Sequence, residues 1–197
     1  MAAYMRNQFL FYGIKAPERR KLYQDFLKKA KKGKEIDWKL LDQAFHAPYR
    51  EFQYFALDYL ERMEHFLVYE DLLRLEGYAL LNPWWDTIDR FDCLMGGVRK
   101  EDPRVDQLMI SYSLSDHFWL RRIAINHQRK RKEKTNLRLL QEIIENNLGQ
   151  EEFFINKAIG WALREYSKTN PKWVKKFIDD HPSMNSLSVR EGSKYLD

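Results

Sequence analysis

The sequence contains a single cysteine, Cys93, and no long apolar run among its 197 residues. One cysteine excludes a disulfide within the chain and is typical of a reducing compartment. No apolar stretch approaches the roughly 20 residues that span a bilayer, and the first residues lack the layout of a secretory signal. These absences predict a soluble, cytoplasmic protein with no membrane partner.

Recognisable metal and cofactor sites are missing as well. The five histidines lack metal-ligand spacing, and a lone cysteine makes a zinc site improbable. Gly96-Gly97 lacks the flanking residues of a phosphate-binding loop. No serine or cysteine has the surroundings of a nucleophile, and Cys93 is expected to be a small core residue. We therefore expect no metal and no cofactor.

Hydrophobic, aromatic and basic side chains are abundant. Hydrophobic residues make up 44% of the chain and aromatic residues 15%, which is enough for a sizeable core. Lys and Arg number 34 against 29 Asp and Glu, for a formal net charge of +5. This balance favours a polyanionic partner, although many basic proteins bind none.

Helix-start signals recur along the chain, whereas the period-two alternation of strands is nearly absent. About ten helices joined by short loops are predicted, which places neighbouring helices antiparallel. The start signals are Ala16-Pro17, Asp37, Pro48, Asn82-Pro83, Asp102-Pro103, Ser115-Asp116, Thr135, Gln150 and Asn170-Pro171.

A faint internal repeat points to a solenoid. An aromatic residue is followed four residues later by a polar or charged one at Trp85/Asp89, Phe118/Arg122 and Phe153/Lys157, and the aromatics lie 33 and 35 residues apart. That spacing is close to the period of two-helix repeats. We predict an all-α, right-handed stack of antiparallel helical pairs. It would be a HEAT-like repeat α-solenoid over residues 1–197, one monomeric domain with a concave basic face. An irregular helical domain is the alternative.

Equivalent positions of successive repeats line one face of a solenoid. Asp89, Arg122 and Lys157 are therefore expected on one surface. Trp85 and Trp161 each lie four residues from one of these charged residues and share its helix face. The alternative for Arg122 is an ion pair rather than a phosphate contact, and Asp86 is expected to cap a helix or face solvent.

Two basic runs admit two interpretations. The first, between Lys28 and Lys34, suits a solvated helix end, where cations complement the helix dipole. The second contains Arg129, Lys130 and Arg131 and is expected to close the helix that carries Arg122. It is either an exposed helix end or a secondary contact with a phosphate backbone.

Several stretches resemble the AlkD family, the HEAT-like repeat DNA glycosylases of alkylation repair. The similarity extends over nearly the whole chain, and its most specific parts are Trp84–Asp89 and Phe153–Tyr166. The similar stretches are Tyr4–Phe9, Gly13–Arg20, Trp84–Asp89, Phe118–Arg122, Phe153–Tyr166 and Ser188–Glu191.

The resemblance implies excision of cationic alkylpurines, such as 3-methyladenine and 7-methylguanine, from double-stranded DNA. Asp89 matches the catalytic carboxylate of the family. Trp85 and Trp161 match the indoles that hold the lesion deoxyribose and backbone. Arg122 matches a phosphate-contacting arginine, and Tyr4 matches a tyrosine near the same site.

The implied chemistry is coherent. An alkylated purine already carries positive charge, so it leaves without a general acid, and the sugar passes through an oxocarbenium-like transition state. A carboxylate stabilises that cation and orients water, and indole faces add cation–π attraction. Most enzymes that act on a base extrude it from the duplex. The resemblance implies an exception, in which the enzyme reaches the lesion from the DNA backbone without extruding the base.

Two alternatives to a glycosylase remain. Family members usually carry helices before the motif that starts at Tyr4, so the chain is alternatively a shortened paralogue that binds DNA weakly and excises nothing. A protein-binding scaffold is the third possibility, since helical repeats are often used in that way.

Overall fold

A computed structural model describes residues 1–98 and 102–196. Within these ranges the regular structure is eleven α-helices with short 3-10 helices, and pairing of the strand type is confined to an isolated bridge between Leu10 and Tyr49. The predicted all-α class is confirmed. The chain divides into two compact units, Met1–Thr87 and Ile88–Asp197.

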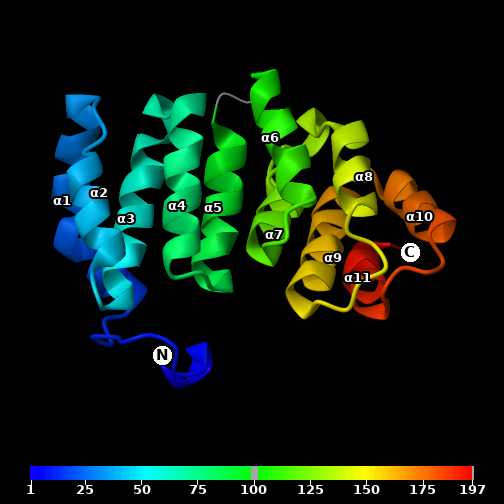
Figure 1. Ribbon diagram of the computed structural model, residues 1–197, viewed down its shortest axis with the longest axis horizontal. Coiled ribbons are helices and arrows are strands. Elements are labelled where there is room, and N and C mark those ends of the chain that lie inside the picture. The colour runs from blue at the N-terminus through cyan, green and yellow to red at the C-terminus, as the bar shows by residue number, and fades with distance from the viewer. Residues whose placement is uncertain (99–101, 197) are drawn as a thin grey trace. The chain divides into compact units, whose positions relative to one another are not determined.

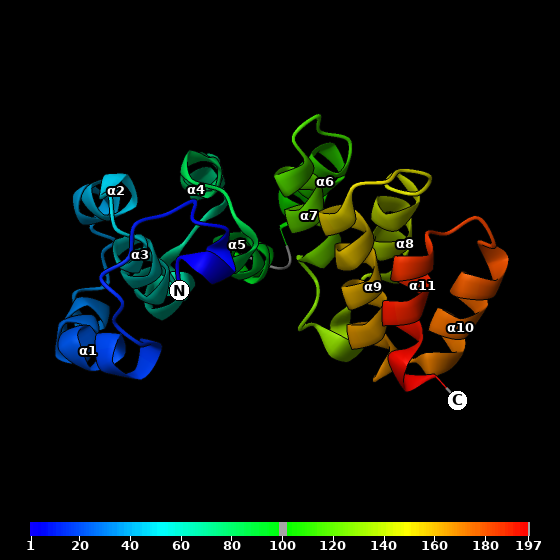
Figure 2. The same cartoon turned by 90° about the horizontal axis from the view of Figure 1, so that it is seen from below.

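The first unit is built around α3, which packs against α1 and α2, and α2 in turn contacts α4 (Figures 1 and 2). Its buried core includes Leu41, Leu57, Leu60, Met63 and Leu75. The helices of this unit are α1 (Ala16–Gly33), α2 (Trp38–His46), α3 (Arg50–Met63), α4 (Leu72–Leu81) and the first turn of α5 (Trp85–Gly97).

The second unit is built around α9, which packs against α7, α10 and α11, as Figure 2 shows for α11. Its core includes Phe91, Ile123, Ile143, Ile159 and Val174. This succession of packed helices is a helical-repeat fold, as predicted. After the rest of α5, its helices are α6 (Pro103–Ser113), α7 (Phe118–Asn126), α8 (Leu137–Glu145), α9 (Phe153–Ser167), α10 (Pro171–Asp180) and α11 (Ser186–Gly192).

Side-chain caps explain several of the helix starts. The Oδ1 atoms of Asp37 and Asp102 accept the backbone N–H groups of Leu40 and Arg104 at 2.9 and 3.0 Å. Asn170 caps α10 in the same way, and α1, α6 and α10 each carry a proline in their first turn. These residues satisfy N–H groups that a helix start leaves unpaired. The starts predicted at these positions are confirmed.

Other boundaries differ from the predictions. The cap of α8 is Asn136 rather than Thr135, and the cap of α9 is Glu152 rather than Gln150. Helix α7 ends at Asn126, and the second basic run lies in a turn and a 3-10 helix after it. The expectation that this run closes the helix of Arg122 is therefore wrong. Helix α4 starts at Leu72 without a side-chain cap, because the Asp71 carboxylate before it accepts the backbone N–H of Val68 instead, and this start was not predicted.

A buried arginine ties α3 to the start of α5 inside the first unit. The Arg50 guanidinium makes a bidentate pair with Asp86, at 2.6 and 3.0 Å, and also donates to the Asn82 carbonyl at 2.8 Å. The hydroxyl of Tyr54 donates to the same carboxylate at 2.6 Å. Asp86 is therefore a buried structural partner, and the expectation that it caps a helix or faces solvent is wrong.

None of the helices in the described ranges combines the length and the apolar character needed to cross a bilayer.

Candidate functional site

Asp89 on α5 and Arg122 on α7 form an ion pair within the second unit. Both Nε and Nη2 of Arg122 lie 2.8 Å from Oδ1 of Asp89, and Nη1 donates to the Phe154 carbonyl at 2.6 Å. The arginine is buried, whereas Asp89 remains partly exposed. The structure therefore shows the ion-pair alternative for Arg122, and its phosphate contact stays a prediction.

Trp161 on α9 is surrounded by guanidinium groups. Its ring centroid lies 5.5 Å from the Cζ of Arg122, 5.1 Å from that of Arg129 and 5.7 Å from that of Arg164. An indole face attracts cations at these distances. Because Arg122 contacts both Asp89 and Trp161, three of the predicted site residues are brought together from three helices.

A second acidic residue, Asp92, lies one helical turn after Asp89 and is fully buried. Nη2 of Arg129 donates to both of its carboxylate oxygens, at 3.1 and 2.9 Å, and to the backbone carbonyl of Asp89 at 3.2 Å. Burial raises the pKa of Asp92 to about 6 against the pull of Arg129, and the charge on Asp89 adds to the rise. Sequence reasoning missed this carboxylate, although its spacing from Asp89 was a usable signal.

Asp92 should leave a signature in the pH dependence of stability. Its pKa of about 6 in the folded protein lies above the unfolded value of about 3.9. The folded state therefore binds more protons between these values, and this carboxyl makes the free energy of unfolding fall as pH rises from about 4 to 6. The urea denaturation midpoint of Asp92→Asn should no longer fall between about pH 4 and 6. The midpoint of Asp179→Asn, which removes an exposed carboxylate, should still fall over that range. An unchanged profile in Asp92→Asn would contradict the assignment.

The predicted contact Lys157 lies in a cluster around Glu191 of α11. The Glu191 carboxylate is 2.9 Å from Nζ of Lys157, 2.8 Å from Nη1 of Arg164 and 3.0 Å from Nζ of Lys194. Burial opposes ionisation of Glu191, but hydrogen bonds from Lys157 and Lys194 lower its pKa to about 2. We call these four residues the Glu191 cluster.

Gly160 permits the close approach of Glu191 to α9. A Cβ atom built at Gly160 would overlap Cβ of Glu191 and lie 3.1 Å from the Ser188 carbonyl oxygen. Gly160→Ala is therefore expected to lower the free energy of unfolding by about 1–3 kcal/mol, as overpacking does. Gly77→Ala is a matched control, because it fills open space within α4 and should be neutral or stabilising. Equal urea midpoints for the two variants would contradict this packing.

Two predicted site residues meet in the first unit. The ring of Tyr4 contacts the Trp85 indole edge-on, with centroids 5.7 Å apart, and Tyr4 is largely exposed. The guanidinium of Arg6 lies 5.9 Å from the Trp84 ring. In the first unit, therefore, Tyr4 packs against Trp85 and Arg6 lies against the ring of the preceding residue, Trp84.

The second basic run is partly engaged within the fold. Arg129 pairs with Asp92 as described above, and Nη2 of Arg131 donates to the Gly96 carbonyl at 2.8 Å. Lys130 is exposed. A phosphate contact by this run therefore stays a prediction and is sterically simplest for Lys130.

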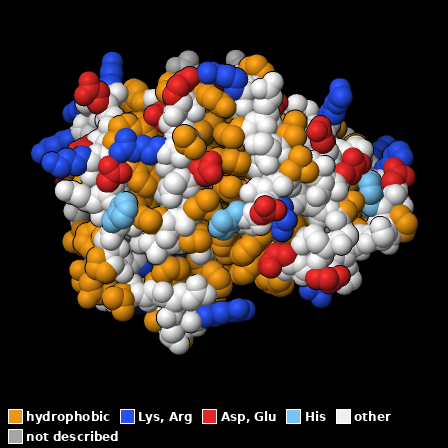
Figure 3. Space-filling model, viewed as in Figure 1, with side chains coloured by type: hydrophobic (Ala, Val, Ile, Leu, Met, Phe, Trp, Pro, Cys, Tyr) orange, Lys and Arg blue, Asp and Glu red, His pale blue; other side chains and the backbone are white. Residues whose placement is uncertain are grey.

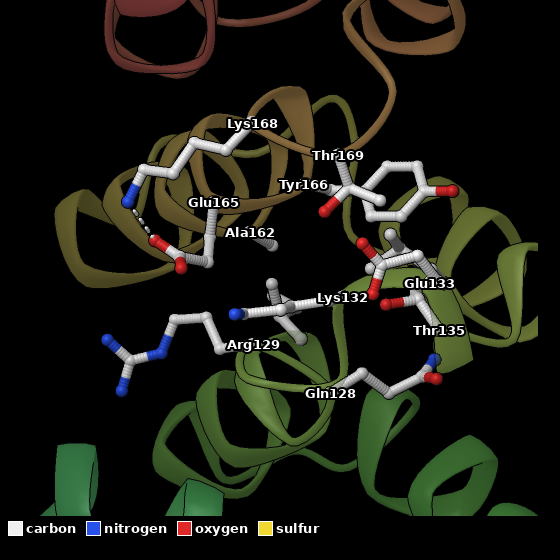
Figure 4. A pocket seen from close by; sticks show the side chains of 12 residues that line it. Gln128, Arg129, Lys132, Glu133, Thr135, Ala162, Glu165, Tyr166, Lys168 and Thr169 are labelled. Atoms are coloured by element: carbon white, nitrogen blue, oxygen red, sulfur yellow. Dashed lines mark hydrogen bonds and ion pairs between the residues drawn. The ribbon is translucent and has the colours of Figure 1, made fainter.

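A cavity of about 280 Å³ lies between α9 and the turn that follows α7 (Figure 4). Lys132 points into it, while Lys168 pairs with Glu165 at 2.6 Å along its edge. Arg129 and Glu133 also line it. Because its charges alternate in sign, the cavity offers no uniform attraction for an anion.

The first unit holds a more apolar cavity of about 600 Å³, lined by Tyr12, Leu22, Phe52 and Phe55 among others. Figure 3 shows hydrophobic side chains gathered at the end of the visible face that carries α1 to α3 in Figure 1. Lys and Arg are interspersed with Asp and Glu on that face. This surface brings no reactive groups together.

Two further features concern metal-ligating and thiol side chains in the described part of the chain. It contains no group of three or more His, Cys, Asp or Glu side chains arranged to hold a metal ion. Burial raises the pKa of the Cys93 thiol to about 12, with the neighbouring Asp92 adding to the rise. Cys93 is therefore a protonated thiol at neutral pH.

Comparisons with known proteins agree with the helical-repeat fold. A family model described as DNA alkylation repair enzyme matches residues 1–196. A structure described as a predicted DNA alkylation repair enzyme from Enterococcus faecalis is 37% identical in sequence and superposes with a TM-score of 0.90. The match covers 100% of the present chain and 92% of the Enterococcus faecalis chain.

A second structure, smu.31 from Streptococcus mutans, is similar in fold, with 17% identity, coverage of 91% and 98% of the two chains, and a TM-score of 0.63. No curated protein matches the chain. The match over residues 1–196 and the 37% identity to the Enterococcus faecalis protein show that the chain belongs to the DNA alkylation repair enzyme family.

Proposed function

We propose that the protein is a DNA glycosylase that releases cationic alkylated purines, such as 3-methyladenine and 7-methylguanine, from duplex DNA. The observation that carries the proposal is that one arginine, Arg122, contacts both the Asp89 carboxylate and the Trp161 indole. A carboxylate, an arginine and an indole are the groups expected beside a sugar that becomes cationic in a DNA backbone.

In the proposed reaction the bond between C1′ of the deoxyribose and the purine nitrogen breaks, and its electron pair leaves with the base. The base starts with a positive charge and departs neutral, so it needs no protonation. Positive charge develops on the sugar, where the Asp89 carboxylate stabilises it. Water then adds to C1′ and gives up one proton to the solvent, which leaves an abasic site.

Arg122 is proposed to position Asp89. Two of its nitrogens contact the same carboxylate oxygen, and this pairing fixes the direction of the Asp89 side chain. A phosphate contact by Arg122, which the family resemblance implies, would have to share this guanidinium with Asp89 and Phe154. Each of its three nitrogens already makes one of these contacts, so a phosphate would bind through the second N–H groups of Nη1 and Nη2.

The aromatic residues and the remaining cations are proposed to hold the DNA. Trp161 would contact the deoxyribose and backbone at the lesion, a role that the family resemblance also gives to Trp85, which the Tyr4 ring contacts. Lys157 would contact a phosphate, and Lys130 a more distant one. Each such contact releases counterions and makes binding sensitive to salt.

Release of free base from methylated duplex DNA tests the proposal. The protein should liberate 3-methyladenine and 7-methylguanine, separated by chromatography, and leave abasic strands that break in alkali. A folded protein that binds duplex DNA and releases neither base would overturn the glycosylase assignment. It would favour a non-excising DNA-binding relative. The ion pair between Asp89 and Arg122 supports that candidate, because it engages the carboxylate within the protein.

A further inference from the structure

The Glu191 cluster gathers three cations around one buried anion. Lys157 and Arg164 come from α9, Lys194 comes from the 3-10 helix after α11, and all three contact the Glu191 carboxylate within 3.0 Å. Three positive charges against one negative charge leave an excess of two.

The three cationic side chains are partly exposed to solvent, although the Glu191 carboxylate that they contact is buried. The side chain of Glu191 is 5% exposed, while those of Lys157, Arg164 and Lys194 are 27%, 24% and 47% exposed. Each cation therefore has its inner side against Glu191 and part of its surface toward solvent. Lysine and arginine carry several N–H donors each, so one bond to Glu191 leaves others for a ligand.

The cluster lies beside Trp161. Lys157, Trp161 and Arg164 are spaced by four and three residues along α9 and so share one face of that helix. The guanidinium of Arg164 lies over the Trp161 ring, with Cζ 5.7 Å from its centroid. An anion bound at the cluster would sit next to the indole that is proposed to contact the DNA backbone.

We propose that the Glu191 cluster is a binding site for a backbone phosphodiester of duplex DNA, with Glu191 as the residue that positions its cations. This inference rests on the proposed DNA substrate and not on excision. Glu191 and Gly160, which admits it, have no other role in the proposed function. The site adds Arg164 and Lys194 to the predicted contact Lys157.

The physical advantage of the arrangement is preorganisation. Ordering a free lysine or arginine side chain on binding costs about 0.5–1.5 kcal/mol each. Glu191 restricts the three side chains during folding, so less of that cost falls on binding. Guanidinium and ammonium groups are also well suited to phosphate oxygens.

Salt dependence of binding to an undamaged, labelled duplex oligonucleotide tests the site. Arg164→Ala and Lys194→Ala should each reduce the slope of log K against log salt by about 0.9, as expected for one lost phosphate contact. Lys176→Ala is the matched control, because this exposed lysine of α10 pairs with Asp180 outside the cluster. Unchanged slopes in both cluster variants would overturn the phosphate site.

The variant Glu191→Gln distinguishes two effects of Glu191 on DNA binding, the positioning of the three cations and the repulsion of phosphate by its negative charge. Removing a negative charge beside a phosphate site should by itself tighten DNA binding. If Glu191 positions the cations, the folded variant should instead bind several-fold more weakly despite its more positive charge. Tighter binding would overturn the positioning role, and circular dichroism establishes that the variant is folded. If it does not fold, the slopes of Arg164→Ala and Lys194→Ala decide.

Two further measurements test whether the cluster binds phosphate and whether this binding is independent of base excision. Replacing chloride by inorganic phosphate at equal ionic strength should weaken DNA binding by the unmodified protein more than by Arg164→Ala, because phosphate competes for the donors of the cluster. Equal weakening of the two proteins would overturn the proposal. Binding does not require excision. A protein that releases no base but shows the predicted slopes would refute the glycosylase and support this site.

Discussion

Asp89→Asn is expected to lower the rate of methylpurine release by at least about 10²-fold, the size of effect seen when a preorganised group facing transition-state charge is removed. The amide has nearly the same shape as the carboxylate and still offers an oxygen to Arg122, which approaches Oδ1 at 2.8 Å. The variant loses the negative charge that the cationic sugar requires. Binding to the intact duplex, where that charge has not developed, should change little.

Single-turnover rates and binding constants for the same duplex separate these effects. Asp179→Asn, which removes an exposed carboxylate of α10, should match the unmodified protein in both. A rate close to that of the unmodified protein in Asp89→Asn would remove Asp89 from the mechanism. A large loss of affinity with an unchanged rate on bound DNA would make Asp89 a binding residue instead.

Arg50→Ala is expected to produce the largest loss of stability in the first unit, about 3–5 kcal/mol, because it leaves the buried carboxylate of Asp86 without its cation. The Arg50 side chain is 1% exposed and makes a bidentate pair with Asp86. A buried charge that has lost its partner keeps its desolvation cost. Adding Asp86→Asn to Arg50→Ala should therefore recover part of the lost stability.

Arg74→Ala provides the comparison within the same unit. Arg74 also pairs with an aspartate, Asp42, at 2.7 Å, but its side chain is 43% exposed. Pairs of that kind contribute about 0–1 kcal/mol. Urea denaturation should thus rank Arg50→Ala far below Arg74→Ala in stability. Equal losses in the two variants would contradict the structural role given to Arg50.

Local features of the sequence predicted much of the secondary structure. Asp37, Asp102 and Asn170 act within two or three residues of themselves, so their capping role does not depend on the rest of the fold. The spacing of Asp89, Arg122 and Lys157 also indicated which positions belong to equivalent helices. Arg122 indeed reaches Asp89 in the structure.

Pairings between distant residues were harder to predict. The charges of Arg129 and Arg131 are visible in the sequence, but their partners, Asp92 and the Gly96 carbonyl, depend on how the turn after α7 packs. Lys157 was predicted to face DNA, and the structure adds that Glu191 holds it. The residues next to Glu191 in the sequence do not predict that its carboxylate is buried, because its burial depends on the absence of a side chain at Gly160, 31 residues earlier.

The most direct test of the central claim uses a duplex that contains one 7-methylguanine. The unmodified protein should release free 7-methylguanine and leave one abasic site per lesion, whereas Asp89→Asn should bind the same duplex and release nothing measurable in the same time. Release of the base at equal rates by both proteins would contradict the role of Asp89. Intact lesions after incubation with the folded, DNA-bound unmodified protein would contradict the glycosylase itself.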